Sequence, residues 1–206
     1  MNPVKEVCVE SFDEALRAVS GGASRIELCD NLTFGGTTPS FGTIKKCLSE
    51  LSVPIMVMIR PRGGNFVYSA VEFEIMQEDI RICRELGANG VVFGLLTAAG
   101  EIDKERTVRL IQLSGPMEVT FHKAIDSATN LLESVAFLKE AGVDRILSSG
   151  GQPTALEGRN LLNRMIELAA PDTAIIVAGK VTYENFEEIR EIIPSSEYHG
   201  RRLVEF

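Results

Sequence analysis

The chain alternates between two kinds of hydrophobic pattern. Short apolar runs rich in β-branched residues are each followed by a longer segment in which apolar residues recur three and four positions apart. The first pattern is typical of a buried β-strand and the second of a helix with one apolar face. The predicted strands are residues 4–9, 25–29, 54–60, 90–94, 118–122, 145–148, 174–178 and 197–199. The predicted helices are residues 12–20, 40–51, 71–86, 104–113, 131–141, 154–169 and 183–192.

This order of elements predicts a closed barrel. Glycines follow three of the predicted helices, in GGA at 21–23, LGANG at 86–90 and AGVDR at 141–145, where a left-handed cap favours glycine. Strands that alternate with helices through short connections form a parallel sheet. Eight such units favour a (β/α)₈ TIM barrel over an open doubly wound sheet. The first strand–helix junction, VESFDEAL, also lacks the glycine-rich fingerprint of a dinucleotide-binding fold.

The chain forms one domain, residues 1–206, because no linker, low-complexity stretch or charge block divides it. Barrels of this kind usually need about 250 residues. Only GRRLVEF follows His199, so a normal eighth helix does not fit. We therefore predict an abbreviated C-terminal corner, or one that a partner subunit covers.

Composition narrows the class of protein. Apolar residues make up 45% of the chain and charged residues 24%, which is ordinary for a globular domain. The net charge of −8 argues against a nucleic-acid or anionic-membrane partner. No apolar run reaches the roughly 20 residues that span a bilayer, and the start MNPVKEVCVE is charged where a signal peptide is apolar. We expect a cytoplasmic protein whose four cysteines, at positions 8, 29, 47 and 83, are reduced thiols.

The predicted barrel interior is unusually polar. Alternate residues of each strand point inward, and the large aliphatic residues suit the helix-facing side. The side chains left for the interior are Glu6, Cys8, Glu10, Arg25, Glu27, Cys29, Met56, Met58, Arg60, Thr120 and His122. A barrel kept only for stability would fill these layers with Val, Ile and Leu, so the interior indicates a function. Buried charges require partners, and we expect Glu27 to pair with Arg25 or Arg60.

Two chemistries fit these residues, and the first is binding of a soft metal. Barrel enzymes keep their functional groups at the carboxyl ends of the strands. Cys8 and Cys29 lie on adjacent strands with the same inward parity, so their sulfurs can approach one another. Thiolate and thioether ligands select Cu(I), and Met56 and Met58 are neighbouring thioethers.

The second chemistry is anion binding with acid–base catalysis. Arg60, Arg62 and Lys123 can hold a carboxylate or phosphate while His122 or Glu27 moves protons. The SSGG sequence at 148–151 and the glycine at 179 offer backbone N–H groups near the usual phosphate site of such barrels. The residues alone leave both chemistries open.

The chain contains seven contiguous motifs: EVCVES (6–11), GASRIELCDNL (22–32), GGTTPSFG (35–42), VMIRPRGGNFVYS (57–69), VTFHKAID (119–126), ILSSGG (146–151) and EYHG (197–200). Together they closely resemble the CutC copper homeostasis family. The resemblance implies a (β/α)₈ barrel that handles copper in the cytoplasm, holds Cu(I) through Cys8 and Cys29, and forms a homodimer or higher homo-oligomer. Five further residues match motif positions that look like an enzyme pocket: Arg25, Glu27, Arg60, His122 and His199.

The chain departs from the family pattern at three places. The family's HRA after the fifth strand is HKA at 122–124, its TSGG is SSGG at 148–151, and its GGGI-like turn after the seventh strand is Gly179-Lys180-Val181. A lysine in that turn weakens the expectation of a backbone phosphate cradle. Our hypothesis is therefore a cytoplasmic copper homeostasis barrel with Cu(I) on Cys8 and Cys29. The alternative is a TIM-barrel lyase, isomerase or hydrolase that acts on an anionic small metabolite.

Overall fold

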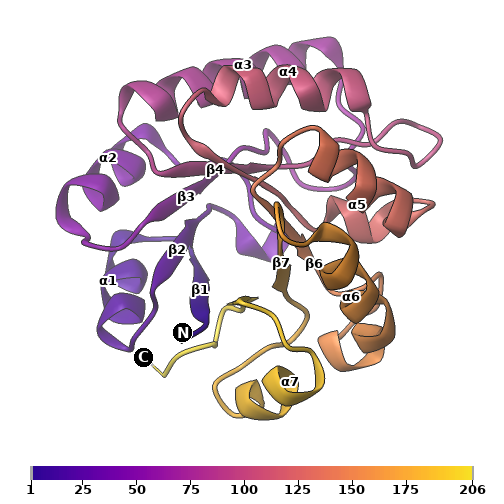
Figure 1. Ribbon diagram of the computed structural model, residues 1–206. Coiled ribbons are helices and arrows are strands. Elements are labelled where there is room, and N and C mark those ends of the chain that lie inside the picture. The colour runs from indigo at the N-terminus through magenta and orange to yellow at the C-terminus, as the bar shows by residue number, and fades with distance from the viewer. Residues whose placement is uncertain (1, 206) are drawn as a thin grey trace.

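Eight parallel strands close into a barrel in chain order, in a computed structural model that describes residues 2–205. Strand β1 completes the closure by pairing with both β2 and β8, with Glu6 opposite Arg25 on one side and His199 on the other. The predicted (β/α)₈ TIM barrel is confirmed (Figure 1). The strands are β1 Val4–Val9, β2 Arg25–Leu28, β3 Ile55–Met58, β4 Gly90–Phe93, β5 Glu118–Phe121, β6 Arg145–Ser148, β7 Ala174–Val177 and β8 Glu197–His199.

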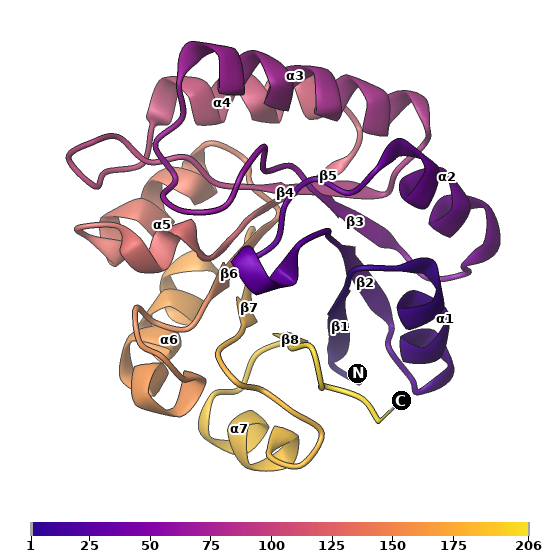
Figure 2. The same cartoon turned by 180° about the vertical axis from the view of Figure 1, so that it is seen from behind.

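Helices surround this barrel, and most begin at a side-chain cap. Ser69 caps its helix in a capping box with Glu72, which satisfies backbone N–H groups of the first turn. The α-helices are α1 Phe12–Ser20, α2 Phe41–Glu50, α3 Ala70–Glu85, α4 Lys104–Ser114, α5 Leu131–Glu140, α6 Ala155–Ala169 and α7 Phe186–Ile192. Two short 3₁₀ helices that the sequence pattern did not predict are η1 Leu32–Phe34 and η2 Lys123–Ser127. The segment containing η1 crosses the open end of the barrel near the centre of Figure 2.

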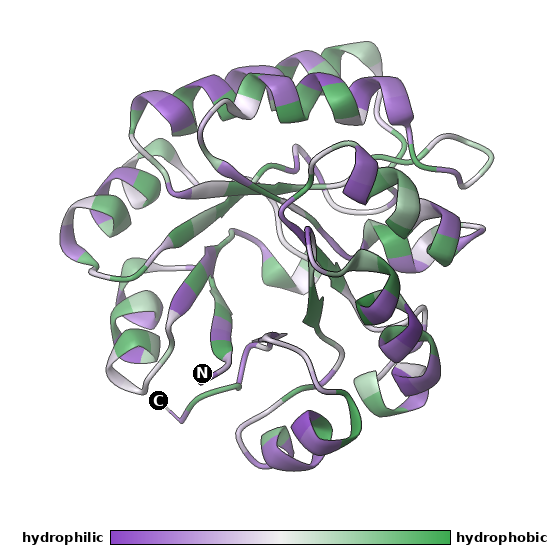
Figure 3. Cartoon of the chain, in the orientation of Figure 1, coloured by the Kyte–Doolittle hydropathy of each residue, from purple (hydrophilic) through white to green (hydrophobic). Residues whose placement is uncertain are grey.

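The hydrophobic core lies between strands and helices, as the alternation predicts. Val7, Val9, Ile26 and Leu28 are fully buried in this outer layer. Two small apolar clusters are separate from it: Cys29 with Met56, Met58 and Val92, and Leu147 with Ile176 and Ala178. Hydrophilic colour appears within β1 and β2 in Figure 3, whereas β7 is hydrophobic along its length. The buried polar residues of β1 and β2 are Glu6, Arg25 and Glu27.

The C-terminal corner is abbreviated, as predicted. No helix follows β8 within the described residues; 200–205 instead run as an irregular tail between α7 and α1 (Figure 1). Leu203 and Val204 of this tail are buried in the outer core, and Arg202 forms a parallel bridge with Thr182. The tail thus covers apolar surface that an eighth helix would otherwise bury.

Three further expectations concern turns, thiols and membrane segments. Gly22, Gly87 and Gly142 have φ angles of 98°, 76° and 84°, which confirms the left-handed turns after three helices. All four cysteines are buried, free thiols. Within residues 2–205, no helix has the length and apolar character needed to cross a bilayer.

Candidate metal and ligand site

The amino-terminal end of the barrel interior holds a network of paired charges. Arg25 on β2 donates to Glu6 at 2.5 Å and also to Glu197. Arg145 on β6 lies 3.0 Å from Glu197 and 2.8 Å from Glu118. Burial by itself would lower the pKa of Arg25, but its two carboxylate partners outweigh burial and raise the pKa. The guanidinium of Arg25 is therefore held charged by these carboxylates.

The next layer toward the carboxyl end brings three metal-donor side chains together. Cys8 on β1, Glu27 on β2 and His199 on β8 each offer a ligand atom, and these atoms lie within 4.8 Å of one another. Cys8 pairs directly with Glu27 in the β1–β2 register, while β8 closes on the other edge of β1. Barrel closure is thus what joins residues at opposite ends of the sequence.

His199 is oriented by a carboxylate behind it. Its Nδ1 is 2.8 Å from Oε1 of Glu6, and its Nε2 is 3.8 Å from Oε2 of Glu27. Burial opposes ionisation of Glu6, yet Arg25 and His199 lower the pKa of Glu6 to about 2. Burial also opposes protonation of His199, but Glu27 and Cys8 raise the pKa of His199 well above its usual value. The Nδ1–H group therefore donates to ionised Glu6, and Nε2 faces the cluster.

Glu27 is the shared neighbour of the two interior thiols. Sγ of Cys29 donates to Oε2 of Glu27 at 3.5 Å, while Cys8 belongs to the three-residue cluster. Burial raises the pKa of Glu27. Burial, together with repulsion from Glu27 and Cys8, also raises the pKa of Cys29 well above its usual value. Cys29 is accordingly a protonated thiol. It lies beside the cluster that contains Cys8 and outside the set of atoms within 4.8 Å.

The expected pairing of Glu27 with an arginine is wrong. Within residues 2–205 the ion-pair partner of Glu27 is His199, at 3.8 Å. Arg25 lies one layer toward the amino end of the barrel, where Glu6 and Glu197 take its guanidinium. Oε1 of Glu27 is buried and has no hydrogen-bond partner among the described residues.

A cavity of about 160 Å³, which we call the inner cavity, opens beside this cluster. Cys8, Glu27, Met58, His122 and His199 line it, together with residues of the loops at the carboxyl ends of the strands. Nδ1 of His122 accepts from the backbone of residue 124 at 3.2 Å, so its proton is on Nε2, which has no partner within 2–205. Burial, assisted by a nearby guanidinium, lowers the pKa of His122 to about 3. His122 is a neutral donor at physiological pH.

Arg60 holds loops in place and does not line the inner cavity. Its Nη1 donates to the carbonyls of Phe34 and Gly36 at 3.1 and 2.7 Å, and its Nη2 to that of Gly64 at 2.8 Å. These bonds fasten the η1 segment to the loop after β3. Arg62 is similarly committed, through a 2.5 Å bond to Glu72 and further bonds to carbonyls. The terminal nitrogens predicted to hold an anion are therefore occupied by the protein's own loops.

The predicted phosphate cradle at 148–151 is filled by a carboxylate of the chain. The backbone N–H groups of Ser149 and Gly151 donate to Asp126 at 3.0 and 2.9 Å. The hydroxyls of Ser148 and Ser149 donate to the same carboxylate at 2.6 and 2.9 Å, and Lys123 lies 3.4 Å from it. Asp126 was missed as a structural anchor, although it belongs to the VTFHKAID motif.

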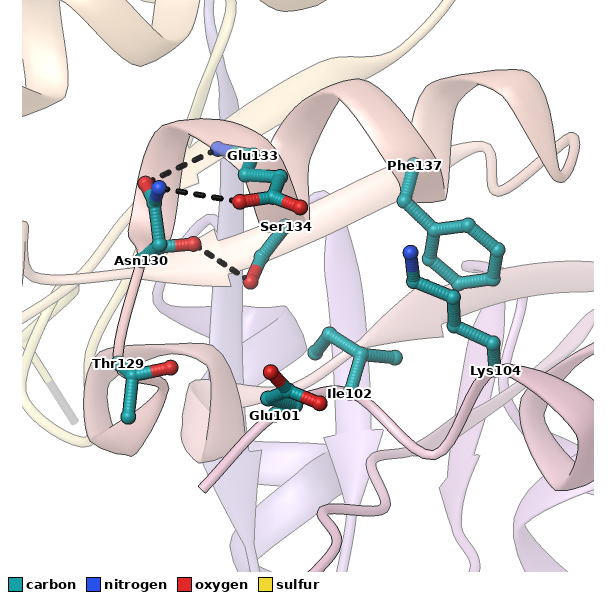
Figure 4. A pocket seen from close by; sticks show the side chains of 8 residues that line it. All are labelled: Glu101, Ile102, Lys104, Thr129, Asn130, Glu133, Ser134 and Phe137. Atoms are coloured by element: carbon teal, nitrogen blue, oxygen red, sulfur yellow. Dashed lines mark hydrogen bonds between the residues drawn. The ribbon is translucent and has the colours of Figure 1, made fainter. Parts of the chain in front are cut away.

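A shallow depression of about 90 Å³ lies away from the barrel axis, between the start of α5 and the loop before α4. Asn130 there accepts from the backbone N–H of Glu133 and donates to its carboxylate, and Ser134 donates to the carbonyl of Asn130 (Figure 4). Lys104 lies over the ring of Phe137. Because its polar groups cap a helix and bind one another, this depression is not the candidate site.

The fold and its interior define a TIM-barrel protein with a buried thiol–imidazole–carboxylate cluster at the carboxyl end. The family model of the CutC family matches residues 4–203, and the chain belongs to this family. It is 43% identical over 194 residues to a human copper homeostasis protein cutC homolog, covering 94% of this chain and 71% of that protein. It is 42% identical over 200 residues to CutC of Chromobacterium violaceum, covering 97% and 81%. A CutC structure from Streptococcus agalactiae superposes with a TM-score of 0.93 at 36% identity, covering 98% of this chain and 100% of the other.

Proposed function

We propose that this CutC-family barrel binds Cu(I) in the cytoplasm, with Cys8 and Cys29 as its thiol ligands. The observation that carries the proposal is the buried cluster in which Cys8, His199 and Glu27 present donor atoms within 4.8 Å. Thiolate and imidazole are ligands that Cu(I) accepts. The copper homeostasis role printed for the human relative supports the choice of metal.

The surroundings of the cluster suit a metal-binding imidazole. Ligating histidines usually give their second ring nitrogen to a carboxylate that fixes the tautomer and the ring orientation. Glu6 stands in that position, 2.8 Å from Nδ1 of His199, and Arg25 holds Glu6 in turn. Nε2 of His199 is thereby directed toward Cys8, and Met58 adds a thioether to the same cavity. Arg25 thus supports the site from behind.

Cys29 joins the site by losing its proton. Its thiol lies 3.5 Å from Glu27, and burial keeps it protonated when no metal is bound. Metal ligands must be deprotonated, so copper binding at Cys29 releases a proton and the apparent affinity rises with pH. Glu27 is the nearest acceptor on the route of that proton.

Anaerobic titration of the reduced protein with Cu(I), in competition with a chromogenic chelator, tests the proposal. We expect Cys8→Ser to abolish tight binding and Cys29→Ser to weaken it. Cys47→Ser and Cys83→Ser are matched controls, because both thiols are buried in helices outside the barrel interior. An unchanged stoichiometry and affinity in the Cys8→Ser/Cys29→Ser double variant would exclude this site.

We also propose that the protein forms a homodimer or higher homo-oligomer. Phe34, Phe41 and Val71 are 69%, 56% and 64% exposed, and burying these side chains against a second copy of the chain would be favourable. Light scattering coupled to size exclusion is the test. A mass of one chain at micromolar concentration would contradict the proposal.

A second candidate function is supported by the orphaned polar atoms of the inner cavity. Nε2–H of His122 and Oε1 of Glu27 are buried with no partner within residues 2–205, although such groups are normally satisfied. A substrate oxygen accepting from His122, with Glu27 exchanging a proton, fits a lyase, isomerase or hydrolase acting on an anionic small metabolite. Ligand-observed NMR with a mixture of anionic metabolites tests it. Ligands that bind to His122→Gln and Glu27→Gln as tightly as to the wild type would contradict it.

A further inference from the structure

A second cavity, of about 520 Å³, lies at the carboxyl ends of β7 and β8. Among residues 2–205, its lining contains no carboxylate and four cationic side chains: Lys123, Lys180, Arg201 and Arg202. We call this cavity the basic mouth. It is a concave, positive region on a chain whose net charge is −8. A local reversal of sign in a hollow concentrates anions there.

The four cations are not equivalent. Lys123 lies 3.4 Å from Asp126. Arg201 lies 3.2 Å from Glu10, and Arg202 lies 2.9 Å from Glu184. These carboxylates hold three of the cations at the rim. Within residues 2–205, Lys180 has no ion-pair partner. The uncompensated charge of the basic mouth therefore lies on Lys180.

The backbone around Lys180 adds hydrogen-bond donors. Gly179 and Lys180 have φ angles of 102° and 57°, and a lysine with a left-handed φ is uncommon and strained. The N–H groups of Gly179, Lys180 and Val181 donate to no acceptor within 2–205, and all three residues line the cavity. Successive backbone N–H groups in such a turn form a concavity that binds anions.

The basic mouth adjoins the inner cavity, because two residues belong to the lining of both. Lys123 and His199 line both. The volume of the basic mouth falls in the usual range for small-molecule sites. The loops after the seventh and eighth strands are also the usual position of a bound phosphate in TIM barrels. An anionic group at the basic mouth leaves the rest of its molecule facing His122 and Glu27.

We propose that the basic mouth binds the phosphate of a small phosphomonoester whose remainder enters the inner cavity. A phosphate offers several acceptor oxygens and about two negative charges, which matches Lys180, the rim cations and the free N–H groups better than a carboxylate does. Of the two stretches expected to offer N–H groups to a phosphate, 148–151 is filled by Asp126, which leaves the turn at 179–181. This inference rests on the second candidate function and is independent of copper.

Calorimetric titration with inorganic phosphate, and with acetate at matched ionic strength, tests the proposal. We expect saturable binding of phosphate, weak or no binding of acetate, and a loss of at least about fivefold in phosphate affinity in Lys180→Gln. Lys45→Gln is the matched control, because Lys45 is exposed on α2 and outside the basic mouth. Lys180→Gly tests the same loss in a backbone that adopts this φ freely.

The outcomes separate the basic mouth from the metal site. Phosphate binding that is lost in both Lys180 variants and retained in Lys45→Gln and Cys8→Ser would support the proposal. Equal affinities in the wild type and the Lys180 variants, or equal affinities for phosphate and acetate, would overturn it. Cu(I) binding in Lys180→Gln is expected to equal that of the wild type, so failure of one site leaves the other measurable.

Discussion

The two ends of the barrel interior are both polar, but their polar groups are used differently. At the amino end, Arg25 and Arg145 meet Glu6, Glu118 and Glu197 in a closed network of ion pairs. At the carboxyl end, two polar atoms that line the inner cavity have no hydrogen-bond partner among the described residues. A paired network needs no ligand to satisfy it, whereas orphaned buried groups do. Polarity alone therefore does not identify a functional interior; unsatisfied polar atoms that line a cavity are the stronger indication.

The two ends are also joined by Glu6. Its carboxylate contacts Arg25 on one side and His199 on the other, at 2.5 and 2.8 Å. The ion-pair network thus fixes the orientation of a proposed metal ligand. Substitutions in the network at the amino end should lower the free energy of unfolding. Substitutions at the carboxyl end should change ligand binding and have smaller effects on folding.

The largest expected effect is that of Arg25→Met. The substitution leaves Glu6 with His199 alone and Glu197 with Arg145 alone, and breaking such a buried ion pair costs about 3–5 kcal/mol of the free energy of unfolding. Urea denaturation monitored by circular dichroism measures the loss. Arg81→Met is the control, because Arg81 forms an exposed pair with Glu78 that should contribute less than about 0.5 kcal/mol. Equal losses in the two variants would refute a stabilising network.

Asp126→Ala should have the next largest effect. It removes the acceptor for the N–H groups and hydroxyls of residues 148–151 and should lower the free energy of unfolding by about 2 kcal/mol. Inorganic phosphate can occupy the emptied cradle, so it should raise the melting temperature of the variant more than that of the wild type. The same rise in both proteins would contradict an internally filled cradle.

A smaller effect is expected from pH through His122. Its pKa is about 3 when folded and about 6.5 when unfolded, so between these values the unfolded chain binds a proton that the folded chain does not. Stability from this group is complete above pH 6.5 and decreases below it, by up to about 1.4 kcal/mol per pH unit. Denaturation of wild type and His122→Gln between pH 6.5 and 5 compares the two slopes. Parallel slopes would show that His122 does not titrate in this way.

The smallest expected effect is that of Lys180→Gly on stability. Glycine relieves the left-handed strain but increases the entropy of the unfolded chain, so we expect a net gain of about 0.5 kcal/mol. Asn31→Gly is the control, since asparagine already tolerates the φ of 49° at that position. Thermal unfolding followed by calorimetry measures both. A clear destabilisation by Lys180→Gly would mean that the lysine side chain stabilises this turn.

The sequence predicted the barrel because periodicity is a local signal. Period-two runs and helical spacing identified every strand, and parity placed Cys8, Glu27 and Cys29 in the interior. The interaction partners of the cationic and acidic side chains were not predictable in this way. Arg60 binds backbone carbonyls of loops, and Asp126 reaches residues 22 or more positions away. Such contacts depend on loop paths that no residue pattern encodes.

The covering of the closing corner was likewise beyond the sequence pattern. Leu203 and Val204 belong to a tail too short to show any periodicity, yet they are 0% and 4% exposed. The arrangement of side chains around Cys8 and Cys29 was also only partly predictable. Their common parity was predictable, but the position of Glu27 as the neighbour of both thiols depends on side-chain conformations within a crowded interior.

X-ray absorption at the copper edge, on reduced protein loaded with one equivalent of Cu(I), tests the metal site most directly. We predict sulfur and nitrogen neighbours, with the sulfur contribution reduced in both Cys8→Ser and Cys29→Ser and the nitrogen contribution reduced in His199→Gln. A spectrum with oxygen and nitrogen neighbours alone, or one that stays the same in all three variants, would contradict copper binding in the barrel interior.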